Sequence, residues 1–427
     1  MTSLQGTNPK AENRESKLGL LYLTLPVANL AIMFLWMTVG AFVLPVHVQR
    51  ITGTNDVAAL GLANSIGPLM ATIANPIFGR ISDRTRSRFG RRAPWIVICV
   101  LVGSLTIFAM SNAASVLVLG ISWAAVQTIM NGYQAAVTAI MPDRVPANRY
   151  GTFSALFGIG TPIAVIIGAS MFIVIPELAQ GGGYFVAIGV LLVAAALIVF
   201  GSPDKSSLDM APETAQSFGA KAVQSSGAKA FLMSFVIPLK SHNFRWAFVS
   251  RFGIMLGYMV IFTFNLFLLE DFIKIPKSEV IGKMGILMLI GQVATLAAVL
   301  VIAPIADKIG KFRLFALISG VVSAVSLVIP LLMPSFNGMV IYNIAHGVAF
   351  GVFMAVDMAL VTKVLPQAES VGTDMGVINI ANAGPQIMAP AIAAFVVTQG
   401  GYTALFAVGI VISLIGVAGL IKIRGIR

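Results

Sequence analysis

Hydrophobic positions in this chain fall into long blocks, and short polar segments separate them. A helix that crosses the hydrocarbon core of a bilayer needs about 20 mostly apolar residues, and each block reaches roughly this length. The pattern therefore predicts twelve transmembrane helices. They are expected near residues 20–46, 57–78, 95–111, 114–138, 152–175, 183–200, 244–269, 280–303, 313–333, 337–362, 374–398 and 402–421.

The composition agrees with this pattern. Hydrophobic residues make up 58% of the 427 and charged residues only 10%, with a mean hydropathy of +0.92. A soluble domain carries about 25% charged residues, so this chain has too few charged residues to form the surface of a water-soluble protein. We therefore expect an all-α membrane protein embedded in a lipid bilayer.

The net charge of +12 would suit a nucleic-acid partner, but the basic residues follow a different rule. Of the 28 Lys and Arg residues, 23 lie toward the side of the termini, four (Arg50, Lys274, Lys277 and Lys283) lie toward the other side, and Arg251 falls inside a predicted span. Short cytoplasmic loops of membrane proteins are enriched in Lys and Arg. The first 17 residues show no apolar signal-peptide segment. We predict a protein of the cell membrane with both termini cytoplasmic, and no nucleic-acid partner.

The two parts of the sequence repeat each other. Asp83, at the end of the second predicted span, matches Asp307, and Pro142 matches Pro366, each pair 224 residues apart. A common offset indicates two homologous six-helix halves. A Ser-, Ala-, Lys- and Gly-rich stretch divides them, so the expected domains are 1–200, a cytoplasmic linker 201–243, and 244–427.

The loop after the second predicted span carries a specific motif. Residues 79–95 read Gly-Arg-Ile-Ser-Asp-Arg-Thr-Arg-Ser-Arg-Phe-Gly-Arg-Arg-Ala-Pro-Trp. This segment resembles the loop between the second and third helices of major facilitator superfamily transporters. Asp83 and Gly90 are seven residues apart, whereas Asp307 and Gly310 are three apart. The longer spacing resembles that of the glycoside-pentoside-hexuronide cation symporters and the sucrose transporters. The segment 142–152 fits the same group.

The resemblance implies a fold and a gating mechanism. The fold would consist of two pseudo-symmetric six-helix bundles with the substrate between them near the midplane. In the family resembled, Asp83 faces the N-terminus of the eleventh helix, where a carboxylate gains about 0.3–1 kcal/mol from the helix dipole. Asp307 would do the same at the fifth helix. The expected gating residues are Gly79, Asp83, Arg84, Gly90, Arg91, Asp307 and Gly310. Arg86, Arg88 and Arg92 are equally consistent with a role in topology alone.

One departure from that family concerns the coupling ion. Its sodium-coupled members carry carboxylates on the second helix, one of them in an Asp-Pro pair, where this chain has Asn75-Pro76 and, one turn earlier, Ala71. A sodium site needs anionic oxygens, so the sequence favours proton coupling or no coupling. Cys99 is the only cysteine, and we expect neither a metal site nor a cofactor.

Polar residues recur at helical spacing on the four helices that line the cavity in the resembled fold, the first, fourth, seventh and tenth. Trp123, Gln127, Asn131 and Gln134 share one face of the fourth span. Amide and imidazole groups beside aromatic rings suit the hydroxyls and apolar face of a sugar. Interhelical hydrogen bonding is the alternative role for any one amide. The remaining candidates for substrate binding are Asn29, Trp36, Tyr258, Asn265, Asn343 and His346.

Arg251 and Asp357 are ionisable residues inside predicted spans. Such a residue costs about 2.5–3.5 kcal/mol or more in a membrane unless it is paired or hydrated. Both are expected about 10 Å deep on cavity helices of the same half, given a rise of ~1.5 Å per residue. The sequence therefore predicts an ion pair that serves proton coupling, or a purely structural pair.

These observations leave three possible functions open. The first is proton-coupled uptake of a small sugar or glycoside by a monomeric symporter, with a small-molecule substrate and protons as partners. The second is export of drugs or metabolites, and the third is a sensor or assembly partner that transports nothing. The sequence has no nucleotide-binding glycine loop and no metal-ligand cluster, so we do not expect an enzyme.

Overall fold

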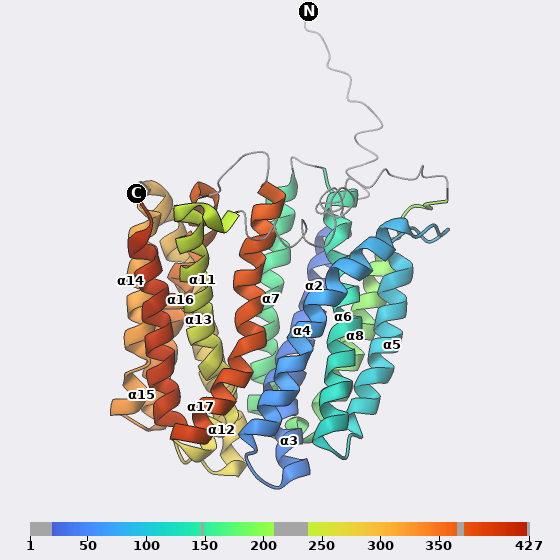
Figure 1. The fold of residues 1–427 in the computed structure, drawn as a ribbon. Coiled ribbons are helices and arrows are strands. Elements are labelled where there is room, and N and C mark those ends of the chain that lie inside the picture. The colour runs from blue at the N-terminus through green and yellow to red at the C-terminus, as the bar shows by residue number, and fades with distance from the viewer. Residues whose placement is uncertain (1–18, 147–148, 209–237, 365–370, 425–427) are drawn as a thin grey trace, which may run out of the picture. The chain divides into compact units, whose positions relative to one another are not determined.

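The computed structural model describes residues 19–146, 149–208, 238–364 and 371–424 (Figure 1). Most of the predicted linker 201–243 lies outside the described residues. The described ranges are almost entirely helical and contain no strand. The predicted all-α fold class is confirmed.

The helices before the linker include a break in the first span, where a π-helix, η1, joins two α-helices. The elements are α2 (Leu21–Leu35), η1 (Trp36–Val43), α3 (Leu44–Thr52), α4 (Val57–Arg84), α5 (Ala93–Ser111), α6 (Val116–Arg144), α7 (Tyr150–Val174), the 3₁₀ turn η3 (Pro176–Gln180) and α8 (Gly182–Gly201).

The helices after the linker include two that are interrupted. The elements are the 3₁₀ turn η4 (Pro238–Lys240), α11 (His242–Phe262), α12 (Asn265–Asp271), α13 (Lys277–Ile309), α14 (Phe312–Ser326), α15 (Ile329–Leu332), α16 (Phe336–Val364) and α17 (Val371–Lys422).

The predicted number of spans is confirmed. Eleven helical segments of the described residues are long and apolar enough to cross a membrane. The last of them, in α17, is broken at Gly401, where φ is 71° and ψ is −172°. Glycine adopts positive φ without a Cβ clash, so the chain turns there and α17 supplies both the eleventh and the twelfth spans. The protein is a multi-pass membrane protein.

The chain folds into two compact units. The first consists of Met1–Val43, Met70–Gly168 and Glu177–Pro212, and the second of Leu44–Leu69, Ala169–Pro176 and Glu213–Arg427. The segments Leu44–Leu69 and Ala169–Pro176 thus group with the second unit although they precede the linker. The predicted domain boundaries 1–200, 201–243 and 244–427 stay a prediction.

In the first unit, α5 packs against α6 and α8, and α2 packs against α8 and α6 (Figure 1). Small residues allow close approach where apolar helices meet without a hydrophobic driving force. Gly132 is such a position, because a Cβ there would lie 2.7 Å from the ring of Phe78.

In the second unit, α11 packs along α17, and α16 packs against α13 and α14. Gly253 of α11 and Gly416 of α17 meet so closely that a Cβ on Gly253 would lie 2.8 Å from the Cα of Gly416. Beside this contact, Phe244, Ile254 and Phe353 belong to a buried apolar core. This packing positions the polar residues of α11 and α16, including Arg251 and Asp357.

Candidate functional site

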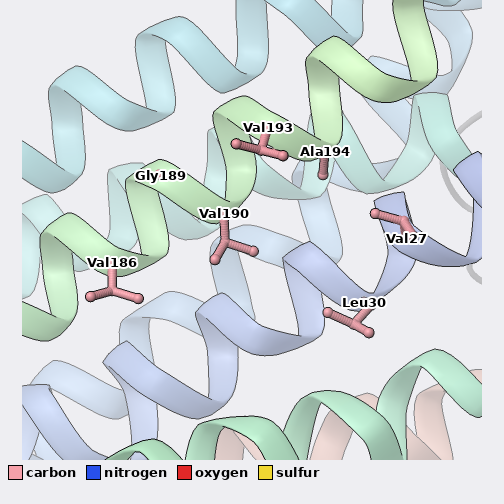
Figure 2. Close-up of a pocket in the computed structure, with 7 residues that line it drawn as sticks. All are labelled: Val27, Leu30, Val186, Gly189, Val190, Val193 and Ala194. Carbon is pink, nitrogen blue, oxygen red and sulfur yellow. The ribbon is translucent and has the colours of Figure 1, made fainter. Parts of the chain in front are cut away.

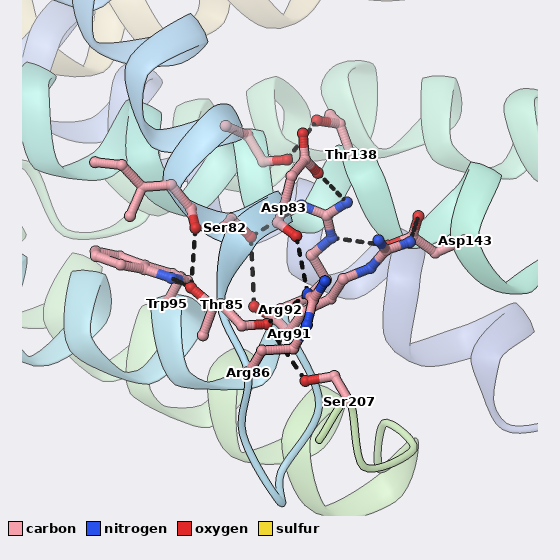
Figure 3. Close-up of polar contacts among 12 residues, drawn as sticks. Ser82, Asp83, Thr85, Arg86, Arg91, Arg92, Trp95, Thr138, Asp143 and Ser207 are labelled. Carbon is pink, nitrogen blue, oxygen red and sulfur yellow. Dashed lines mark hydrogen bonds and ion pairs between the residues drawn. The ribbon is translucent and has the colours of Figure 1, made fainter. Parts of the chain in front are cut away.

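The loop between α4 and α5 forms an ion-pair network on the predicted cytoplasmic face (Figure 3). Arg92 is only 4% exposed. Its Nη2 lies 2.6 Å from Asp83 Oδ1 and its Nε lies 2.7 Å from Asp143 Oδ2. Arg91 Nη2 contacts the other oxygen of Asp143, also at 2.7 Å. The φ of +85° at Gly90 allows the chain to turn there. We call the four charged residues Asp83, Arg91, Arg92 and Asp143 the loop network.

The loop network adds two residues to the predicted gating set. Asp143 was missed by the sequence analysis, and Arg92 was left without a specific role. Asp143 directly follows Pro142 at the end of α6, so only the three-dimensional fold brings it to the 83–92 loop. Asp83 was predicted to face the N-terminus of the eleventh helix. That end directly follows residues 365–370, which lie outside the described residues, so this contact stays a prediction.

The other predicted gating residues lie at helix ends. Asp307 is exposed in the last turn of α13, and Gly310 ends that helix with φ +68°, its N–H bonded to the Ala306 carbonyl at 2.8 Å. Gly79 is half-buried on α4 and Arg84 is exposed at its last residue. Their role in gating stays a prediction.

Two tryptophans of the predicted binding set are in contact within the first unit. The ring of Trp36 meets that of Trp123 edge to face, with centroids 5.8 Å apart and an interplanar angle of 86°. Trp123 is buried and Trp36 is half-buried. The sequence placed both on cavity-lining helices, and the structure brings them together.

The amides of the first unit have different partners. On α6, Asn131 Nδ2 donates to the carbonyl of Gln127 at 2.8 Å, while Gln127 and Gln134 are half-buried. Asn29 Nδ2 donates to the Phe157 carbonyl of α7, also at 2.8 Å. Asn29 therefore makes an interhelical hydrogen bond, which is the alternative to substrate binding for such an amide.

In the second unit, aromatic rings gather around His346. Tyr258 stacks on the imidazole at a centroid distance of 5.2 Å and an interplanar angle of 13°. Tyr342 lies 5.3 Å from the imidazole centroid at 34°, and Phe350 stacks on Tyr258. Two predicted binding residues, Tyr258 and His346, are therefore in direct contact.

Two other predicted binding residues lie elsewhere. Asn343 Nδ2 donates to the Met339 carbonyl of its own helix at 2.8 Å. The sequence analysis treated Asn265 as part of the seventh helix, but α11 ends at Phe262 and Asn265 begins α12. Tyr258 and Asn265 therefore do not lie on one face of a single helix.

The predicted ion pair between Arg251 and Asp357 is present. Arg251 Nη1 on α11 lies 2.8 Å from Asp357 Oδ2 on α16. The two residues are 7% and 5% exposed. Among the residues whose side-chain burial is described, Asp357 is the one buried acidic residue. Its role in proton coupling stays a prediction.

A polar cluster at the predicted external face was missed by the sequence analysis. Gln49 Nε2 donates to Glu270 Oε2 at 2.9 Å and to Asn55 Oδ1 at 2.6 Å. Asn55 Nδ2 donates to Glu270 Oε2 at 3.1 Å and to Asp271 Oδ1 at 2.7 Å. The Tyr402 hydroxyl donates to Asp271 Oδ2 at 3.1 Å. We call these five residues, all in the second unit, the external cluster. The adjacent Glu270-Asp271 pair was its one sequence signal.

A surface cavity of about 370 Å³ lies between α2 and α8 (Figure 2). Its lining is apolar throughout: Val27, Leu30, Val186, Gly189, Val190, Val193 and Ala194. A binding site for a hydroxylated solute needs a few placed polar groups. We therefore do not assign substrate binding to this cavity.

Apolar helices long enough to cross a membrane and two compact units define a polytopic membrane protein. The sequence model described as MFS/sugar transport protein matches residues 24–405. The chain belongs to this family, which makes it a transporter and not an enzyme.

Known proteins agree with this class. Residues of this chain are 29% identical over 119 positions to the general alpha-glucoside permease of Schizosaccharomyces pombe (strain 972 / ATCC 24843). That match covers 26% of this chain and 20% of the permease, so the chain matches only a fifth of that relative's length.

Solved structures share the whole fold. Crystal structures of the nucleoside transporter NupG superpose with TM-scores of 0.74 and, for a point mutant, 0.76. The sequence identities are 15% and 14%; each covers 95% of this chain and 99% or 100% of the other. At this identity the likeness establishes the fold alone.

Proposed function

We propose that this protein is a proton-coupled symporter that takes up a small sugar or glycoside by alternating access. The observation that carries the proposal is the buried ion pair between Arg251 and Asp357. An ionisable pair inside the membrane is costly, and such residues usually mark proton or substrate pathways. Protonation of Asp357 removes one charge of the pair, so the proton and the position of α11 and α16 become linked.

The substrate class is supported by the candidate binding residues. Gln127, Asn131 and His346 offer neutral donors and acceptors, and Trp36 and Tyr258 offer ring faces. No acid lies within the predicted spans 20–46 and 114–138, which favours a neutral solute over the cationic drugs of many exporters. The family description and the alpha-glucoside permease support a sugar or glycoside.

The membrane and orientation follow from the basic residues. We propose a monomer in the cell membrane. Both termini are proposed to be cytoplasmic, because the basic loops lie on the side of the termini. In this orientation the loop network and Asp307 lie on the cytoplasmic face. They would stabilise the state in which that face is closed.

Uptake into right-side-out vesicles tests the proposal. A panel of labelled glucosides, maltose and nucleosides would be offered with an inward proton gradient, with and without a protonophore. We expect at least one glucoside to accumulate, and the protonophore to abolish accumulation. Accumulation that needs sodium would overturn proton coupling, and gradient-driven loss of preloaded solute would favour the exporter.

A further inference from the structure

His346 has one imidazole nitrogen in contact with α14 and the other without a partner. Nδ1 lies 3.3 Å from Ser323 Oγ and 3.2 Å from Ser326 Oγ. Nε2 is buried and has no hydrogen-bond partner among the described residues. The residue as a whole is 5% exposed.

The serine geometry decides which nitrogen carries the proton. Ser326 Oγ donates to the Ser323 carbonyl at 2.7 Å. A hydroxyl has a single hydrogen, so Ser326 has only lone pairs left for Nδ1. The contact with Ser326 is therefore a hydrogen bond only if Nδ1 carries the hydrogen and donates it, and Ser323 Oγ then accepts from the same hydrogen. In a neutral imidazole, Nε2 is then a hydrogen-bond acceptor.

A buried acceptor without a donor destabilises a protein, so we expect Nε2 to be paired in some state of the transport cycle. The stacked ring of Tyr258 and the tilted ring of Tyr342 fix the plane of the imidazole. Nε2 lies on the edge of the imidazole away from the nitrogen that contacts the two serines. A solute hydroxyl is a donor of suitable size and neutral charge.

We propose that His346 Nε2 accepts a hydrogen bond from a hydroxyl of the transported solute, and that Ser323 and Ser326 are positioning residues that hold the imidazole in this tautomer. This inference rests on the proposed sugar transport. It assigns a function to two serines of α14 that no sequence motif indicated.

Deoxy analogues of the substrate test the acceptor. The half-saturation concentrations for the best transported glucoside and its monodeoxy analogues would be measured for the wild type and for His346→Phe. One hydrogen bond to a neutral group corresponds to roughly a two- to tenfold change in affinity. In the wild type one particular deoxy analogue should bind this much more weakly. In His346→Phe the parent and that analogue should bind equally.

Three serine variants test the positioning. Ser323→Ala combined with Ser326→Ala removes both hydroxyl groups near Nδ1, so discrimination against the deoxy analogue should shrink. Ser326→Thr, which keeps the oxygen, should preserve it. Ser319→Ala is the matched control. Ser319 is a buried serine of the same helix, and its Oγ donates to the Ala316 carbonyl at 2.8 Å. It should leave discrimination unchanged.

The outcomes separate the two proposals. If the wild type transports no member of the panel, the proposed function and this inference both fail. If it transports a glucoside, but every deoxy analogue loses the same affinity in the wild type and in His346→Phe, the inference alone fails. If His346→Phe does not fold, discrimination in the Ser323→Ala, Ser326→Ala double variant equal to that in Ser319→Ala overturns the inference.

The external cluster carries a second inference independently. It joins Gln49 and Asn55, which precede the linker, to Glu270, Asp271 and Tyr402, which follow it. In alternating access the two homologous parts must separate on one face and then on the other. We infer that the external cluster is a latch that stabilises the externally closed state.

The chemistry of the latch suits repeated opening. Its donors are amides and a phenol, and its acceptors include two carboxylates, so the bonds are strengthened by charge without joining opposite charges. Asn55 is central because its one amide nitrogen contacts Glu270 and Asp271. Asn55→Asp would replace this donor by a carboxylate beside two others and oppose closure.

A charge exchange tests the latch. Asn55→Asp should slow uptake several-fold. Asn55→Asp combined with Asp271→Asn should recover part of the uptake, because an amide again faces a carboxylate at positions 55 and 271 while the new carboxylate at position 55 still faces Glu270. Asp56→Asn is the control, because Asp56 instead caps α4 through the Ala59 N–H at 2.9 Å. Failure of the exchanged pair to recover uptake, with both variants folded, would overturn the latch.

Crosslinking gives a second measurement. Gln49→Cys with Glu270→Cys, in a Cys99→Ala background, places two thiols on the residues whose side-chain ends are hydrogen-bonded. A short bifunctional methanethiosulfonate can span the atoms that the shorter cysteine side chains lack. Crosslinking with this reagent should stop transport, and reduction should restore it. Undiminished transport by crosslinked protein would also overturn the latch.

Discussion

Arg251 of α11 and Asp357 of α16 form an ion pair at 2.8 Å, and both residues are buried inside the predicted spans. The pair connects two helices that the resembled fold places around the cavity. Removing one partner leaves a buried charge unpaired, whereas removing both leaves none. We therefore expect single and double variants of this pair to differ in stability.

Asp357→Asn should uncouple transport from the proton gradient. The amide keeps the shape of the side chain but cannot take up and release a proton. We expect exchange of labelled for unlabelled substrate to remain measurable, while accumulation driven by a pH gradient is lost. Counterflow and gradient-driven uptake in the same vesicles would measure both. Accumulation equal to that of the wild type would contradict the coupling role.

Arg251→Ala alone should destabilise the protein by about 3–5 kcal/mol, because Asp357 is left without its buried partner. Arg251→Ala with Asp357→Ala should recover most of this loss, because no charge remains. Thermal unfolding in detergent would compare the single and double variants. Additive losses in the double variant would show that the pair is not energetically coupled.

Asp83→Asn and Asp307→Asn test the predicted cytoplasmic gate. Each should favour the state open to the cytoplasm and slow net transport without abolishing substrate binding. The loop network adds a control, because Asp143→Asn also weakens the contacts of Arg92 but leaves Asp83 intact. An effect of Asp83→Asn that Asp143→Asn reproduces in full would indicate loss of the loop network. Unchanged transport in both Asp83→Asn and Asp307→Asn would contradict the gate.

Gln127→Ala and Asn131→Ala should each weaken substrate affinity several-fold, as expected for one lost hydrogen bond of about 0.5–1.5 kcal/mol. Trp36→Ala should weaken it more, because it removes a ring face and the contact with Trp123. Binding measured by substrate-dependent thermal stabilisation would check all three. Asn29→Ala is the contrast, since it breaks the bond to Phe157 and should lower stability. Affinity unchanged in the first three variants would contradict the proposed site.

Much of the fold could be predicted because a bilayer imposes simple rules. Apolar blocks of sufficient length gave the twelve spans, and the depth of Arg251 and Asp357 within them gave the ion pair. The break at Gly401 also lies between the predicted spans 374–398 and 402–421, as expected. These features depend on hydropathy along the chain and on counting helical turns.

The remaining features depend on contacts between distant segments. Arg92 binds Asp143, which lies 51 residues further along the chain, and no local pattern marks this choice. Asn55 and Asp271 are 216 residues apart. The end of α11 at Phe262 interrupts a stretch whose hydropathy continues. Hydropathy does not encode such pairings or breaks, because several packings bury the same apolar area.

The π-helix Trp36–Val43 has a consequence for the direction of the first span's side chains. An α-helix advances by 3.6 residues per turn, whereas the i→i+5 bonds of a π-helix give a wider turn. Eight residues wound in this way change the angular register of everything beyond them. Gln49, in α3, therefore cannot be placed by counting turns from Asn29 in α2. The wide turns set the direction from which Gln49 reaches Glu270.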